Sequence, residues 1–294
     1  MSGNSELRAL INLLDDPDEE VYNHVKVKLL SMGHNVIPML ETVWEMGDPF
    51  QQTVQTRIEN IIHEIQFEQV KKSLKTWRFE NSDDLLAGTI LIAQYQYPDL
   101  NVEKIQQKIQ QICQDVWLEL NDNLTALERI KIINHIIFDV HGFSGNTTNY
   151  HAPQNSYLNN VIESKKGNPL SLAVLYSVIA QRLEIPIYGV NLPEHFVLCY
   201  KANNEFLELL SKTDNDYGVL FYINPFSRGV VFNKKEIDLF IKQLHVDARP
   251  EYYAPCDNVE IIKRMLRNLI SSYDKLGYIR KKEELQELYD SIDD

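Results

Sequence analysis

The segment 170–184, "LSLAVLYSVIAQRLE", is apolar on nearly every side of the helix that it predicts. Its apolar residues fall around the whole circumference instead of along one stripe: Leu170, Leu172, Val174, Leu175, Val178, Ile179 and Leu183. A helix of this kind is buried on all sides, so other elements must enclose it. The chain has 294 residues, of which 44% are hydrophobic, and this is enough to build a sizeable core around such a helix.

Four strand-like runs follow this helix, rich in β-branched and aromatic residues. They are "PIYGVNL" (186–192), "HFVLCYK" (195–201), "NEFLELL" (204–210) and "GVLFYIN" (218–224). Short runs of this composition, separated by polar turns, predict an antiparallel sheet. We therefore expect a mostly helical α+β fold in which a small antiparallel sheet lies against the buried helix.

The N-terminal residues are helical by pattern and nearly repeat. The pairs Asp16-Pro17 and Asp48-Pro49 lie 32 residues apart, and apolar residues at helical spacing follow each pair. We expect each Asp to cap a helix and each Pro to take its first position, where the missing N–H costs no hydrogen bond. The period is similar to that of HEAT-like repeats. A plain helical bundle is the alternative.

These patterns divide the chain into three parts. Residues 1–80 form the HEAT-like helical region, and residues 81–250 form the core, with three helices leading into it. Residues 251–294 contain two helices separated at "KLGY" and resemble one tetratricopeptide-type hairpin.

Composition excludes several classes of function. The formal net charge of -13 gives no global attraction for nucleic acid or anionic membranes. The three cysteines, Cys113, Cys199 and Cys256, are odd in number and lack the paired spacing of a disulfide framework or a zinc site. No phosphate-binding loop, dinucleotide fingerprint or signal peptide is evident. We expect a cytoplasmic protein with no cofactor, no metal and neither nucleic acid nor membrane as a partner.

Four motifs occur in order around the buried helix: "GFSGN", "NSYLNNVIESKKGNPLSLAVLY", "EIPIYGVNLPEHF" and "INPFSRG". Together they resemble the SirB-type subfamily of the transglutaminase-like superfamily, whose core has a papain-like fold. The resemblance covers about residues 80–290 and is densest over 138–230. It implies a bacterial protein with helical regions on both sides of the core. It also implies a cysteine nucleophile at the start of the buried helix, a histidine on a facing strand, and an Asp or Asn that orients the histidine.

Carried over residue by residue, this pattern is incomplete. The histidine of the superfamily falls on His195 in "LPEHF", and the orienting residue falls on Asn224 in "INPF". The nucleophile position in Gly167-Asn168-Pro169 is Pro169. The nearest hydroxyl, Ser171, lies two residues further on, about 200° around a helix. Cys199 lies about 13 Å along the strand from His195, which is too far for a nucleophile and its base.

Three functions remain open. The resemblance implies a catalytically degenerate protein that acts as a protein-interaction or regulatory module and contacts a protein partner through its helical regions. The first alternative is a hydrolase or acyltransferase that uses Ser171, His195 and Asn224. The second is a cleft that binds a small molecule or peptide without turnover, with recognition groups from Gly167, Asn168, Pro169 and Asn191. Ser171 could instead cap the helix that begins at "NPLS", and His195 could be a hydrogen-bonded core histidine.

Overall fold

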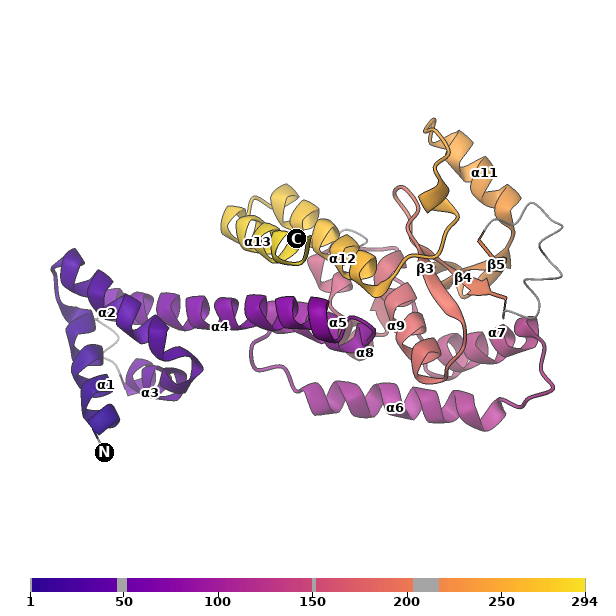
Figure 1. Ribbon diagram of the computed structural model, residues 1–294. Helices are drawn as coiled ribbons and strands as arrows, with labels where there is room; N and C mark the ends of the chain where they lie inside the picture. The colour runs from indigo at the N-terminus through magenta and orange to yellow at the C-terminus, as the bar shows by residue number, and fades with distance from the viewer. Residues whose placement is uncertain (1, 47–51, 150–151, 203–216, 294) are drawn as a thin grey trace. The chain divides into compact units, whose positions relative to one another are not determined.

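A computed structural model describes residues 2–46, 52–149, 152–202 and 217–293. The chain forms two compact units, residues 1–73 and residues 74–294. The helix α4 begins in the first unit and ends in the second (Figure 1).

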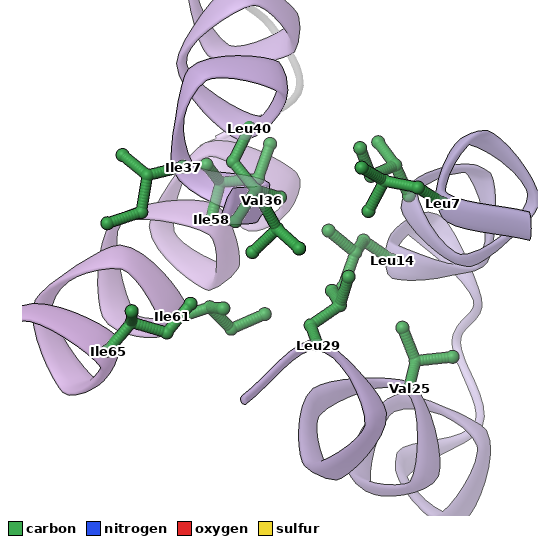
Figure 2. Packing of buried hydrophobic residues seen from close by; sticks show 11 residues of the cluster. Leu7, Leu14, Val25, Leu29, Val36, Ile37, Leu40, Ile58, Ile61 and Ile65 are labelled. Atoms are coloured by element: carbon green, nitrogen blue, oxygen red, sulfur yellow. The ribbon is translucent and has the colours of Figure 1, made fainter. Parts of the chain in front are cut away.

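The described part of the first unit contains helices joined by short turns and no strand. Its elements are α1 (Ser2–Asn12), η1 (Leu13–Asp15), α2 (Glu19–Met32), η2 (Gly33–Val36), α3 (Ile37–Met46) and the larger, N-terminal part of α4 (Gln52–Glu80). Aliphatic side chains from all of these helices meet in one cluster, shown in Figure 2. Leu14, Leu29, Leu40 and Ile61 have no exposed surface in it, so burial of this cluster is the main term that holds the unit together.

The start of α2 corrects one prediction. Asp18, not Asp16, caps the helix, because its carboxylate accepts from the backbone N–H of Glu20 at 2.8 Å. Asp16 accepts from the N–H of Asp18 at 2.9 Å, so Pro17 lies in a turn that precedes the cap. The second pair, Asp48-Pro49, lies outside the described residues. The HEAT-like assignment stays a prediction.

The second unit contains the remaining helices and all described strands. Its helical elements are α5 (Leu85–Gln96), α6 (Val102–Glu119), α7 (Ala126–Asn134), the π-helical turn η3 (His135–Val140), η4 (Pro153–Ser156), α8 (Leu158–Ser164), α9 (Pro169–Arg182), η5 (Pro225–Ser227), α11 (Lys234–Gln243), η6 (Pro250–Tyr252), α12 (Asn258–Lys275) and α13 (Ile279–Asp293). The last two pack against each other and are joined by a turn in which Gly277 has a φ of +77°. No described helix combines the length and apolarity that crossing a bilayer requires.

The sheet is antiparallel and has the order β3-β4-β5-β6. Its strands are β3 (Ile187–Val190), β4 (Val197–Lys201), β5 (Val219–Asn224) and β6 (Val230–Phe232). The first three correspond to predicted runs, whereas the predicted run 204–210 lies outside the described residues. The strand β6 was not predicted, because it has three residues and two of them are exposed. Separately, β1 (Ser144–Gly145) and β2 (Lys166–Gly167) form a short parallel pair.

The helix α9 is the centre of the second unit. Every residue from Pro169 to Ala180 is buried, as the all-round apolar pattern predicted. It contacts β3 and β4 on one side and α5, α6, α8 and α12 on others (Figure 1). The mostly helical α+β fold, with a small antiparallel sheet against a buried helix, is therefore confirmed.

Candidate functional site

A cavity of about 540 Å³ opens beside the first turn of α9. Its walls come from the segment around η4, the start of α9, the turn before β4, and one face of α12. The lining residues are Ala152, Ser156, Asn168, Pro169, Leu170, Glu194, His195, Phe196, Arg264, Asn268, Ser271, Ser272 and Lys275. The volume lies within the range of small-ligand pockets.

His195 lies in the turn before β4 instead of in the strand itself. The preceding residue, Glu194, has a φ of +57°, and this left-handed conformation interrupts the extended backbone predicted for the run. Such a conformation costs a non-glycine residue about 1–2 kcal/mol, so packing around the turn must hold it in place.

Burial and two neighbouring side chains set the protonation of His195. Burial lowers its pKa below the usual 6.5, because a charged ring is poorly solvated in this position. A hydrogen bond with the side chain of Asn224 raises the pKa, and the positive charge of Arg264 lowers it again. The ring is therefore neutral at neutral pH and available as a base or as a hydrogen-bonding group.

Asn224 is the last residue of β5 and has two roles. Its side chain bonds the ring of His195, and its Oδ1 accepts from the backbone N–H of Ser227 at 3.2 Å. The second bond caps η5 and fixes the amide in position. The structure thus brings His195 and Asn224 together, as the resemblance implied for a histidine and its orienting residue.

Ser171 lies in a different environment. The Oδ1 of Asn168 accepts from the Ser171 N–H at 2.8 Å, and the Ser171 Oγ accepts from the Asn168 N–H at 3.0 Å. These reciprocal bonds form a capping box at the start of α9. Ser171 is not among the described residues that line the cavity, whereas Pro169 lines it together with His195.

The other residues that we predicted for binding differ in whether they reach the cavity. Asn168 lines the cavity, and its Nδ2 donates to Ser156 Oγ at 3.0 Å. Gly167 lies in β2, where a Cβ would come within 2.7 Å of the Ser171 hydroxyl. Gly167 therefore serves the packing of the capping box. Asn191 is outside the lining set, and its Oδ1 accepts from Nη1 of Arg264 at 2.6 Å.

The face of α12 was not predicted from the sequence to be part of the site. Five of the lining residues belong to it: Arg264, Asn268, Ser271, Ser272 and Lys275. Their spacing places them on one side of a helix, and this polar stripe is visible in the sequence. What the sequence does not give is the element that faces the stripe, because α12 follows α9 by about 80 residues.

The three cysteines do not supply a thiolate to this cavity. Burial raises the pKa of Cys113 to about 11 and the pKa of Cys199 and Cys256 to about 12. All three lie in the described part of the chain, and none of them lines the cavity. The same part contains no group of three or more His, Cys, Asp or Glu side chains that could hold a metal ion.

Comparisons with known proteins identify the family of this chain. The family model described as the transglutaminase-like superfamily matches residues 103–267, which include Pro169, His195 and Asn224. A UPF0162 protein of Xylella fastidiosa is 31% identical over 195 residues, covering 64% of each chain. Protein SirB1 of Salmonella typhimurium is 23% identical over 205 residues, covering 68% of this chain and 70% of that protein.

A longer match comes from F-box only protein 21 of Mus musculus, which is 27% identical over 261 residues. That match covers 80% of this chain but 39% of the mouse protein, and the chain spans a little under two thirds of the Xylella protein. No solved structure matches the chain. With a family model that covers more than half of its length and SirB1 among its relatives, the chain belongs to the transglutaminase-like superfamily, in agreement with a SirB-type subfamily.

Proposed function

We propose that this protein works by binding and not by turnover, as a catalytically degenerate transglutaminase-like protein with an interaction or regulatory role. The observation that carries the proposal is the start of α9. The resemblance assigns the nucleophile position of the superfamily to Pro169, and this residue lines the cavity with His195. A proline side chain carries no group that can attack a carbonyl carbon, and the thiols of the chain lie elsewhere.

The capping box argues against Ser171 as a substitute nucleophile. To reach His195, the Ser171 side chain would have to abandon the bond that it accepts from Asn168. The cap that Asn168 Oδ1 provides for the Ser171 N–H would remain, but the freed Asn168 N–H, which is buried, would cost about 1–3 kcal/mol if it stayed unpaired. The Ser171, His195 and Asn224 hydrolase is therefore the less favoured function.

A second candidate function is supported by the cavity itself. A concave site beside His195 that excludes Ser171 suits the binding of a small molecule or peptide without turnover. The likeness to proteins named F-box only protein 21 supports an interaction role, which the helical regions would serve with their exposed surfaces. The two roles are compatible, because an occupied cleft can bias the surface that a partner contacts.

Turnover assays test the proposal. We expect the full chain to hydrolyse p-nitrophenyl acetate and a peptide amide no faster than His195→Ala does, with the exposed-histidine variant His24→Ala as a control for ring reactivity on the surface. The proposal would be refuted if the chain showed turnover that is abolished in both His195→Ala and Ser171→Ala and is kept in His24→Ala.

A variant with a thiol at the nucleophile position tests whether the site still has the geometry of the superfamily's active site. Pro169→Cys places a thiol at the first position of α9, beside a neutral histidine, where a thiolate is favoured. We expect the pH dependence of its rate of alkylation by iodoacetamide to give a pKa below the usual value of about 8.5. His195→Ala in the same background should raise that pKa. The native thiols provide little background because burial raises each of their pKa values.

A further inference from the structure

One wall of the cavity is a continuous polar face of α12. Its five lining residues occur at intervals of four, three, one and three positions: Arg264, Asn268, Ser271, Ser272 and Lys275. At about 100° per residue they fall within roughly 100° of the helix circumference. The opposite side of α12 is apolar and buried, with Ile262, Leu266 and Leu269 in the core. Packing of that apolar side therefore fixes which face the helix turns to the cavity.

The two ends of this wall differ chemically from its middle. Arg264 and Lys275 only donate hydrogen bonds and carry positive charge. The amide and hydroxyl groups between them both donate and accept, as a peptide backbone does. The cavity lining contains one acid, Glu194, so its formal charge is positive in a chain whose net charge is -13.

Arg264 is held in a fixed position. Its Nη1 donates to Asn191 Oδ1 at 2.6 Å and to the carbonyl of Leu192 at 3.2 Å. Its charge acts on the cavity, because it lowers the pKa of His195. The positive end of the wall is therefore preorganised beside the histidine, whereas Lys275 is an exposed side chain at the other end.

The length of the wall defines the size of its ligand. Arg264 and Lys275 are eleven residues apart, which is about 16 Å along a helix axis. An extended peptide rises about 3.3 Å per residue, so about five residues cover the same distance. A compact anion, in contrast, reaches one end of the wall at a time.

We infer that the cavity binds an extended acidic peptide segment of a partner protein, with acidic side chains about five residues apart at Arg264 and Lys275 and with its backbone along Asn268, Ser271 and Ser272. This inference rests on the proposed function, binding in the cleft without turnover. The apolar residues Pro169, Leu170 and Phe196 form the remaining walls, against which small side chains of the peptide would pack.

Calorimetric titration of the full chain with three synthetic peptides tests the inference. The peptides are acetyl-EAGAGE-amide, its neutral counterpart acetyl-QAGAGQ-amide, and acetyl-AGEEGA-amide, which has the same charge with adjacent acids. We expect the first to bind about tenfold more tightly than the other two, as one or two charge-assisted hydrogen bonds would give. Lys275→Gln should weaken the first peptide about fivefold and leave the neutral one unchanged. The surface variant Lys235→Gln, on α11, should change neither.

Several results would overturn the inference. They are equal affinity for the acidic and neutral peptides, equal affinity for spaced and adjacent acids, binding of glutarate as tight as that of the peptide, and no binding of any probe. Arg264→Gln is a second variant, but Lys275→Gln carries the test because its side chain is exposed and its loss does not threaten folding. Failure of the proposed function would look different. Mass spectrometry would then find the titrated peptides cleaved or deamidated, whatever their order of affinity.

Discussion

Replacing Asn168 with alanine should destabilise the second unit by about 2–4 kcal/mol. The Asn168 side chain makes two buried contacts: its Oδ1 caps α9 at the Ser171 N–H, and its Nδ2 donates to Ser156 Oγ. Loss of the cap costs about 1 kcal/mol. Ser156 is 4% exposed, and a buried hydroxyl that loses its partner adds about 1–3 kcal/mol, at the lower end if water from the cavity replaces the amide.

Urea unfolding followed by tryptophan fluorescence measures this change. Trp44 lies in the first unit and Trp77 and Trp117 lie in the second, so the experiment is best done in a Trp44→Phe background in which only the second unit reports. With an m-value of about 2–3 kcal/mol per molar urea, we expect the midpoint to fall by roughly 1 M.

The matched control is Asn101→Ala. Asn101 caps α6 through the Lys104 N–H at 2.9 Å, but it is exposed and makes only that contact in the described part of the chain. Its loss should cost about 1 kcal/mol. If Asn168→Ala costs no more than Asn101→Ala, the capping box and its bond to Ser156 do not stabilise the start of α9 in the way argued above.

Three further changes have defined outcomes. Gly88→Ala should cost about 1–3 kcal/mol in urea unfolding, because the new Cβ would lie 2.7 Å from the ring of Trp77; an unchanged midpoint would contradict this. Tyr95→Phe removes a 2.8 Å hydrogen bond from α5 to Glu284 on α13 and should lower the free energy of unfolding by about 1–2 kcal/mol. A loss of less than a few tenths of a kcal/mol would mean that water replaces this bond. NMR titration should give the ring of His195 a pKa below 6.5. Because the pKa is lower in the folded than in the unfolded chain, the stability that the neutral ring contributes is complete above pH 6.5. That stability is lost as the pH falls toward the pKa of the folded state.

The fold was predictable where local pattern and burial agree. The segment around α9 is apolar on all sides, and only a fully enclosed helix satisfies that pattern, so its burial from Pro169 to Ala180 followed from the local sequence pattern. The strands β3, β4 and β5 were found because each has several β-branched or aromatic residues in succession. In contrast, β6 has three residues, and its pairing with β5 rather than its own pattern makes it a strand.

Helix starts were less predictable because several polar residues compete for one cap. In "DDPDEE" both Asp16 and Asp18 can accept a backbone N–H, and the sequence does not say which one the helix uses. The structure uses both, one for the turn and one for α2. In "NPLS" the opposite holds, because Asn168 and Ser171 satisfy each other and leave one solution.

The site was predictable as far as it depends on neighbours along the chain or on the family resemblance. His195 and Asn224 were identified through the resemblance, and the structure brings the two side chains together. The wall formed by α12 depends on long-range packing between helices far apart in sequence, and periodicity along α12 identifies a polar face without identifying what the face opposes. Arg264, which donates to Asn191, was missed for this reason.

The histidine and its amide partner make physical sense together even without a nucleophile. A buried imidazole needs a hydrogen-bond partner, and Asn224 supplies one without adding a charge beside Arg264. A carboxylate in the same place would favour the protonated ring and would oppose the positive charge that Arg264 brings to the cavity. The pair of His195 and Asn224 therefore keeps the ring neutral and leaves the positive potential of the α12 wall for an anionic ligand. An Asn224→Asp variant should raise the pKa of His195 and weaken the binding of an acidic peptide, and if it strengthened that binding, this account of the cavity would be wrong.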